Sequence, residues 1–319
     1  MIQSKSMLAD KKPIVVVGSI NIDLVTHTTR IPVEGETIAG DNFQIHPGGK
    51  GANQAVAVAR LGYPVRMIGC LGNDTFGETL RDQLEIAGVD IESVETVPGS
   101  SGVAMIVVSD DGENCIIITP GANAQLAPAD LDKNIETIRS AALVLTQLEI
   151  PLETVLHLAT ICTHEGVPLM LDPAPARELP EELLRKVSWL TPNETEAAFF
   201  TNEQDQDRDS NDPVDTAEKI IASGARNVAL KLGARGAYVA SSSGPATFIP
   251  SFSVTAVDTT AAGDAFNGAF AVALAMNMEP AESARFAAAA AAVSVTRSGA
   301  QPSMPTMAEV EQMLNSEIK

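Results

Sequence analysis

Short apolar runs alternate with amphipathic segments along most of this chain. The run Pro13-Ile14-Val15-Val16-Val17-Gly18 is rich in β-branched residues and ends in glycine, which is typical of a buried strand. Similar runs at 65–70, 143–147, 168–172, 189–191 and 227–232 predict further strands. Between them, residues 52–61, 77–87, 152–165, 194–200 and 216–223 have helical patterns. The alternation predicts an α/β fold with a mostly parallel central sheet flanked by helices.

Two segments interrupt this alternation. Residues 24–46 and 102–119 carry strand patterns with no helix between them, and Asp110-Asp111-Gly112 predicts a tight turn in the second. We infer a single α/β domain over 13–310, with lid segments at about 22–47 and 100–121 that form a small β-sheet. Such a sheet can close over strand ends, and its uncovered face can pack against a second copy. We therefore expect a homodimer. The polar, acidic stretch 203–213 predicts a surface loop.

The composition argues against several classes of binding partner and indicates a cellular compartment. The 319 residues carry a formal net charge of −20, which argues against binding to nucleic acid or to anionic membranes. The three cysteines have no metal-binding spacing and fit a reducing compartment. Residues 1–12 lack an apolar core of signal-peptide length, and the longest apolar run, 286–293, is too short to span a bilayer. We expect a cytoplasmic protein.

The run from Asp258 to Gly268 is the strongest candidate for chemistry. Two aspartates, Asp258 and Asp264, flank small residues just before an apolar segment, 269–276, that predicts a helix. Small residues at a helix start allow backbone N–H groups to converge on an anion. An aspartate opposes an anion there unless it has a chemical task, such as accepting a proton from an attacking hydroxyl during phosphoryl transfer. An ordinary N-cap aspartate is the alternative for an isolated Gly-Asp pair.

A second motif, Gly48-Gly49-Lys50-Gly51-Ala52-Asn53-Gln54, combines close backbone approach with a cation and amides. It is not a dinucleotide fingerprint, because the first strand leads instead into Gly18-Ser19-Ile20-Asn21-Ile22-Asp23. The amide and carboxylate of Asn21 and Asp23 suit bidentate binding of vicinal hydroxyls. A polar turn is the alternative for this piece alone.

These two runs resemble the paired signatures of the PfkB-type carbohydrate kinases, and the resemblance covers roughly residues 13–305. Finer motifs resemble the ribose-phosphorylating members of that family. They are Pro32-Val33-Glu34-Gly35-Glu36-Thr37, Gly112-Glu113-Asn114, Gly121-Ala122-Asn123, Gln147-Leu148-Glu149-Ile150-Pro151, Pro173-Ala174-Pro175-Ala176 and Thr191-Pro192-Asn193-Glu194-Thr195-Glu196. The resemblance implies an ATP-dependent kinase acting on the 5-hydroxyl of D-ribose, with Mg²⁺ and an activating monovalent cation such as K⁺.

The resemblance also implies roles for individual residues. Asp264 would be the base, and the backbone of Ala261, Ala262, Gly263 and Asp264 would form the anion hole. The ribose ligands would be Asn21, Asp23, Gly49, Lys50, Asn53, Glu149 and Asp264. The nucleotide and its magnesium would lie against Asn193, Glu196, Lys231, Gly233, Ala234, Gly236, Gly263 and Ala288. The monovalent cation would take oxygen ligands from Asp258, Thr260, Ser294, Arg297, Gly299 and Ser303.

Three positions depart from the family pattern. Ala288 replaces a polar residue near the adenine, which would leave only apolar contact there. Asp172 replaces an asparagine, and Lys231 stands where some relatives have threonine. Lys231 could reach a phosphate or simply lie along its loop. A kinase of deoxyribose, fructose or a nucleoside, and a non-catalytic sugar sensor, remain alternatives. An NAD-dependent reductase is disfavoured by the missing glycine fingerprint.

Overall fold

The computed structural model of the chain describes residues 11–201 and 212–316. The loop predicted at 203–213 lies outside the described residues except for its last two positions. Asp212 caps helix α9 (Pro213–Ala222), where its side chain accepts a hydrogen bond of 2.9 Å from the Val214 N–H. The loop prediction therefore extended one residue too far, because Pro213 already begins a helix.

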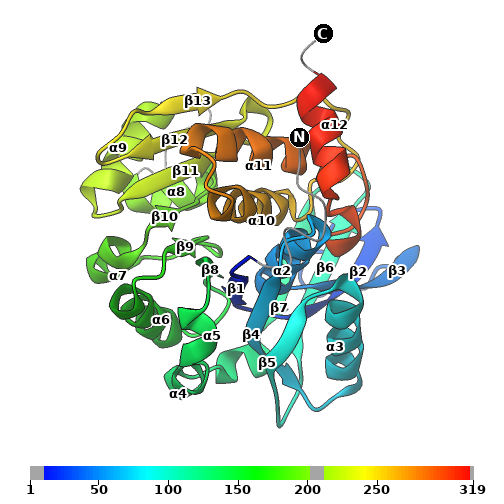
Figure 1. The fold of residues 1–319 in the computed structure, drawn as a ribbon. Helices are drawn as coiled ribbons and strands as arrows, with labels where there is room; N and C mark the ends of the chain where they lie inside the picture. The colour runs from blue at the N-terminus through cyan, green and yellow to red at the C-terminus, as the bar shows by residue number, and fades with distance from the viewer. Residues whose placement is uncertain (1–10, 202–211, 317–319) are drawn as a thin grey trace.

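A nine-stranded sheet forms the centre of the molecule (Figure 1). Its strands, in spatial order, are β13 (Thr247–Ile249), β12 (Ala237–Ser241), β11 (Asn227–Lys231), β10 (Trp189–Leu190), β9 (Leu169–Leu171), β8 (Leu143–Thr146), β1 (Ile14–Val17), β4 (Val65–Gly72) and β5 (Asp90–Val97). All neighbours pair in parallel except β11–β12 and β12–β13, which are antiparallel. The predicted α/β class with a mostly parallel sheet is confirmed.

Strands β5, β12 and β13 are absent from the sequence prediction. β5 and β13 lie at the two edges of the sheet, where one side of the strand has no partner. Four of the eight positions of β5 are exposed, so this strand lacks the continuous apolar run that identifies the central strands. Burial on both faces, which produces that run, belongs only to the interior of the sheet.

Helices cover both faces of the sheet, and β1 shows why. Ile14 and Val16 point into one apolar cluster, whereas Val15 and Val17 point into the other, because side chains alternate along a strand. The first cluster is completed by α2 (Lys50–Arg60), α3 (Thr75–Ala87), α10 (Ala262–Ala275), α11 (Pro280–Ser294) and α12 (Met307–Ser316). The second takes α4 (Pro128–Lys133), α5 (Ile135–Arg139), α6 (Leu152–Glu165), α7 (Glu181–Lys186), α8 (Glu194–Thr201) and α9.

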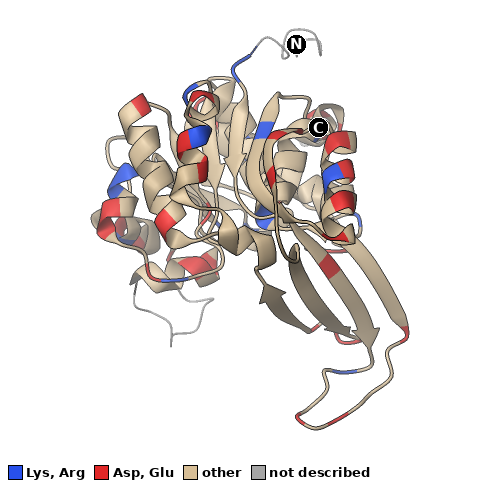
Figure 2. Ribbon diagram, turned by 90° about the horizontal axis from the view of Figure 1, so that it is seen from below, with Lys and Arg blue, Asp and Glu red and all other residues tan. Residues whose placement is uncertain are grey.

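A separate four-stranded sheet projects from the body (Figure 2). It is ordered β3 (Asn42–Gly48), β2 (Asn21–Thr28), β6 (Gly102–Ser109) and β7 (Asn114–Thr119), with two antiparallel hairpins joined by a parallel β2–β6 pair. β2 begins at Asn21, three residues earlier than the predicted strand pattern. Asn21 and Asp23 are therefore strand residues on one face of this small sheet rather than members of a turn.

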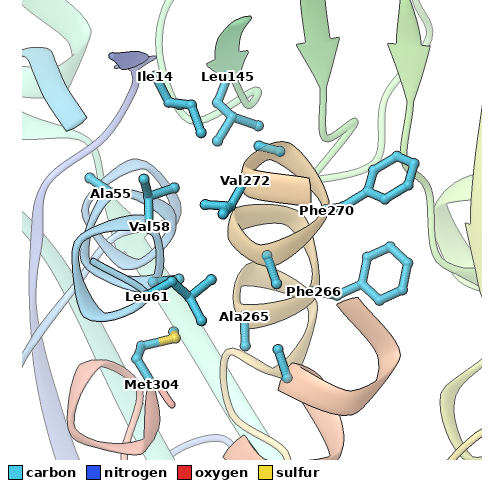
Figure 3. Close-up of a cluster of buried hydrophobic side chains, with 14 of the residues drawn as sticks. Ile14, Ala55, Val58, Leu61, Leu145, Ala265, Phe266, Phe270, Val272 and Met304 are labelled. Atoms are coloured by element: carbon cyan, nitrogen blue, oxygen red, sulfur yellow. The ribbon is translucent and has the colours of Figure 1, made fainter. Parts of the chain in front are cut away.

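Close packing of α2 against α10 brings the two sequence motifs together. Figure 3 shows Ala55 and Val58 of α2, and Leu61 directly after it, facing Ala265 and Val272 of α10. At Gly268 the helices approach so closely that an added Cβ would lie 2.6 Å from the Cβ of Ala57. Because both motifs lie at the amino ends of these two helices, this contact places the side chains of α2 within reach of Asp264.

Within the described part of the chain, no helix combines the length and apolar character that crossing a bilayer requires.

Candidate active site

Four neighbouring parallel strands deliver polar side chains to one edge of the central sheet. Glu149 follows β8, Asp172 follows β9, Asn193 follows β10, and Lys231 ends β11. Parallel strands all have their carboxyl ends at the same edge, which is where open α/β sheets bind ligands. The amino ends of α2 and α10 lie at this same edge, since residues Asn53 and Gln54 of α2 contact Asp264 of α10.

Helix α10 begins earlier than predicted, and this creates the candidate anion hole. The helix starts at Ala262 rather than near Ala269, so Ala262, Gly263 and Asp264 all lie in its first turn. Ala261 precedes it in a left-handed conformation with φ of 57°, which non-glycine residues seldom adopt. N–H groups of a first helical turn that have no carbonyl partner bind anions, whereas the Ala262 N–H already donates to the Thr259 carbonyl at 3.2 Å. The four residues predicted to form the hole therefore lie at one helix amino end.

Asp264 is buried, with only 5% of its surface exposed, and is held on both carboxylate oxygens. The Asn53 amide donates to Oδ2 and the Gln54 amide to Oδ1, each at 3.0 Å. Burial raises the pKa of Asp264, although the Lys50 cation and the two amide hydrogen bonds oppose the shift. A raised pKa makes the carboxylate a stronger base, and the amides fix its plane.

The predicted sugar ligands gather around the start of β2 and of α2. Asn21 is oriented by the Asn123 amide, which donates to its Oδ1 at 2.7 Å, and Asn21 in turn contacts Glu149 at 3.5 Å. The backbone N–H of Lys50 donates to Glu149 at 3.2 Å. Gly49 has φ of 87°, and a Cβ there would lie 2.6 Å from the backbone nitrogen of Asn21, so only glycine fits.

Charge is concentrated in this group. Burial raises the pKa of Asp23 to about 7, with further contributions from the charges of Glu149 and Asp264. Burial alone would lower the pKa of Lys50, but the net shift is upward because four carboxylates surround its ammonium: Asp264, Asp172, Glu149 and Glu196. Lys50 therefore stays charged and offsets the mutual repulsion of the acidic groups. Carboxylates of this density can accept hydrogen bonds from several hydroxyls at once.

A cavity of about 370 Å³ lies between α10 and the ends of β9, β10 and β11. Lys50, Asp172, Glu196, Lys231 and Asp264 are among its lining residues. The ammonium of Lys231 pairs with Asp172 at 2.9 Å. Asn193 and Glu196 form a reciprocal pair at the start of α8, where each backbone N–H donates to the other side chain at 2.8 Å. This pairing caps the helix and also holds Glu196 at the cavity.

A second cavity, of about 490 Å³, adjoins the first and shares Lys231, Gly233, Ala262 and Gly263 with it. Its remaining wall is mostly apolar and includes Ala234, Gly236, Phe252, Val254, Phe266, Ala288, Ala291, Ala292 and Val295. A charged cavity that adjoins an apolar one suits a nucleotide, whose phosphates and base need different surroundings. All eight predicted nucleotide contacts line one or both cavities.

The predicted cation ligands come from two distant segments that the carboxylate of Asp258 joins. Its Oδ1 accepts from the Thr260 N–H and its Oδ2 from the Gly299 N–H, each at 2.8 Å. Ser294 and Ser303 donate their hydroxyls to carbonyls of their own turns. The Arg297 guanidinium pairs with Glu309 at 2.9 Å. A positively charged guanidinium cannot bind a cation, so the backbone carbonyl of Arg297 is the group that could act as a ligand. The segments adjoin the anion hole through Thr260.

Several residues of this site had no assigned role in the sequence. Gln54 lies inside the second motif and Asn123 inside a family-like motif, so both could have been noticed as polar residues in otherwise apolar stretches. Phe252, Val254 and Phe266 carry no such signal, because an apolar cavity wall has the same composition as a core.

Comparison with known proteins agrees with this geometry. Residues 11–307 match the pfkB family carbohydrate kinase. A ribokinase of Haemophilus influenzae is 42% identical over 95% of this chain and 99% of its own, and a deoxyribokinase of Salmonella typhi is 38% identical over 95% and 98%. The structure of Arabidopsis thaliana ribokinase complexed with ribose and ATP has a TM-score of 0.87, 36% identity, and covers 95% of this chain and 99% of that one. The chain therefore belongs to the pfkB family of carbohydrate kinases.

Proposed function

We propose that this protein transfers the γ-phosphate of ATP to the 5-hydroxyl of D-ribose, giving ribose 5-phosphate and ADP. The observation that carries the proposal is the position of Asp264. This buried carboxylate lies in the first turn of α10, beside the candidate anion hole, and contacts Asn53 of the sugar-side motif. A base, an anion-binding helix end and a set of hydroxyl-binding groups thus meet at one point.

The reaction follows from these positions. Asn21, Asp23 and Glu149 orient the sugar hydroxyls, and Asp264 accepts the proton of the attacking hydroxyl. The freed oxygen forms a bond to the γ-phosphorus while the bond from that phosphorus to the bridging oxygen of ADP breaks. Backbone N–H groups of the segment 261–264, apart from that of Ala262, which donates to the Thr259 carbonyl, stabilise the negative charge that spreads over the transferring phosphoryl oxygens.

We call the cavity of about 370 Å³ the phosphate cavity and the adjoining one of about 490 Å³ the nucleotide cavity. The charge of the phosphate cavity fits a nucleotide that arrives with Mg²⁺. Four carboxylates line the cavity against two lysines, so a polyphosphate alone would be repelled. Magnesium is commonly held by one or two carboxylates together with substrate phosphates, and Glu196, supported by Asn193, is the residue we propose for this role. Magnesium held there would supply positive charge to offset the negative charge that builds up on the phosphates during transfer.

Potassium activation is expected from the segments around Asp258. Carboxylate, carbonyl and hydroxyl oxygens form a donor set suited to a hard cation, and we propose Asp258, Thr260, Ser294, Arg297, Gly299 and Ser303 as its source. An ion there would stiffen the adjoining anion hole without touching substrate. We expect K⁺ to raise kcat roughly tenfold over Na⁺ or Li⁺, and Asp258→Ala to abolish the effect while the fold is kept. Equal turnover rates in choline buffer with and without K⁺ would contradict the proposed cation site.

Sugar identity is tested by measuring ADP release with D-ribose, deoxyribose, fructose and nucleosides. We expect D-ribose to give the highest kcat/KM. The deoxyribokinase relative makes deoxyribose the sugar of most interest among the alternatives. Faster turnover of another sugar would keep the kinase chemistry and change the substrate, whereas no ADP release with any sugar would leave a sugar-binding protein without catalysis.

We further propose that the small sheet is both a lid and a dimer contact. The strand register aligns Ile45, Leu24, Met105 and Ile117 across the four strands, and Ile45, Met105 and Ile117 are 46–56% exposed. An exposed apolar row of this kind suits a second copy of the same sheet. Met105→Glu with Ile117→Glu should convert a dimer to a monomer in sedimentation experiments. A wild-type monomer would refute the contact.

A cytoplasmic location is also proposed. ATP is available there, and the free cysteines Cys70, Cys115 and Cys162 suit a reducing compartment.

A further inference from the structure

Two positions that depart from the family pattern form a single ion pair. Asp172, directly after β9, and Lys231, at the end of β11, lie 59 positions apart in the chain, and their side chains meet at 2.9 Å. Their side chains are only 2% and 12% exposed. A buried carboxylate left without its partner carries a large desolvation cost, so each of the two residues makes the other tolerable in this cavity.

The pair fixes a cation beside the anion hole. A Cβ added to Gly263 would lie 3.5 Å from the Nζ of Lys231. Gly263 is in the first turn of α10, and Lys231 lines both the phosphate cavity and the adjoining nucleotide cavity. The ammonium is therefore placed where the phosphate end of a nucleotide would meet the helix.

A single amide connects this ion pair to the base. The NH₂ group of Gln54 donates to Oδ2 of Asp172 and to Oδ1 of Asp264, each at 3.0 Å. Its carbonyl oxygen accepts from Gln147 at 2.7 Å, and the side chain is fully buried. The opposite orientation of the amide would set its oxygen against two carboxylates. Gln54 thus uses every donor it has to hold the two aspartates at a fixed separation.

We propose that Asp172 and Gln54 are positioning residues for the kinase reaction proposed above. Asp172 anchors the Lys231 ammonium at the transferring phosphate, and Gln54 ties that anchor to the carboxylate of Asp264. The chain Lys231–Asp172–Gln54–Asp264 then sets the distance between the cation that receives the phosphate and the base that receives the proton. Misplacement of either group weakens phosphoryl transfer, which depends almost entirely on position and electrostatics.

A double-mutant cycle tests the ion pair. Lys231→Met leaves the Asp172 carboxylate unpaired beside the incoming phosphate, so kcat/KM for ATP should fall far more than in Asp172→Asn. The kcat/KM for ATP of the double variant should be about tenfold higher than that of Lys231→Met. The matched control is the exposed pair Lys186–Glu182 of α7, at 2.6 Å, where Lys186→Met and Glu182→Gln should show no coupling. Additive effects of the two site substitutions would overturn the anchoring role.

The pH profile of kcat separates positioning from general structural support. Asp172 raises the pKa of Asp264 beyond the effect of burial, whereas the hydrogen bond from Gln54 lowers that pKa. Asp172→Asn should therefore move the acid limb to lower pH, and Gln54→Met should move it to higher pH while lowering kcat about tenfold at nearly constant KM. Shifts in the same direction, or none, would contradict the link to the base.

Nucleotide affinity gives a measurement that needs no turnover. In calorimetry without sugar, Asp172→Asn and Lys231→Met should each reduce the preference for a non-hydrolysable ATP analogue over ADP, and Lys231→Arg should retain it. An unchanged preference in Asp172→Asn overturns the proposal even if Lys231→Met fails to fold. Failure of the proposed function would differ, because the wild-type protein would then release no ADP with any sugar.

Discussion

Asp264→Asn is expected to lower kcat by roughly 10²–10⁴-fold, the usual contribution of a general base, with little change in sugar affinity. Asparagine keeps the size of the side chain and can still contact Asn53 and Gln54, but its amide cannot accept the proton of the attacking hydroxyl. The raised pKa of Asp264, caused mainly by burial, is what makes the native carboxylate effective in this step. Single-turnover measurements at saturating ATP would report the chemical step directly.

Asp130→Asn supplies a matched control for this substitution. Asp130 lies in α4 on the opposite face of the central sheet, where it accepts from the Ala127 N–H at 3.0 Å and pairs with Lys133. Its replacement should leave kcat unchanged. Turnover close to that of the wild type in Asp264→Asn would show that the base has been wrongly assigned.

Asp23→Ala should raise the KM for ribose by roughly 10²-fold. The sugar hydroxyls that donate hydrogen bonds to Asp23 would be left without an acceptor in a desolvated site. The KM for ATP should change little, since Asp23 lines neither the phosphate cavity nor the nucleotide cavity. Steady-state kinetics with each substrate varied in turn would separate the two effects. Equal loss for both substrates would indicate that Asp23 supports the fold instead.

The pH dependence of stability provides a second measure of Asp23. Its pKa is raised from 3.8 to about 7 in the folded protein, so the folded state holds a proton that the unfolded state releases. Stability from this group is therefore present at low pH and is lost as the pH rises from about 4 to about 7. Asp23→Asn should have a higher Tm than the wild type at pH 8 and nearly the same Tm near pH 4. A lower Tm at pH 8 would contradict burial as the cause.

Residue periodicity alone predicted the α/β class and the central parallel strands. The continuous apolar runs identified β1, β4, β8, β9, β10 and β11, which are the strands buried between two layers of helices. It failed for β5 and β13, because strands at the edges of the sheet lack the apolar pattern that two-sided burial imposes. It also failed for the buried strand β12, whose five residues include two alanines and a serine and so carry a weak strand signal. The start of α10 was placed too late, since small residues in a first helical turn have no periodicity to reveal it.

The sequence by itself also determined which groups are available for catalysis and binding, because short motifs place an aspartate, glycines and amides at fixed local spacing. It left Asp172, Lys231 and Gln54 without a shared role. Asp172 meets Gln54 across 118 positions, and Gln54 meets Asp264 across 210. Such contacts depend on the parallel order of β9, β10 and β11 and on the close approach of α2 to α10 at Gly268. Only the tertiary structure decides them, because hydrogen bonds and ion pairs form over about 3 Å in space, whatever the separation along the chain.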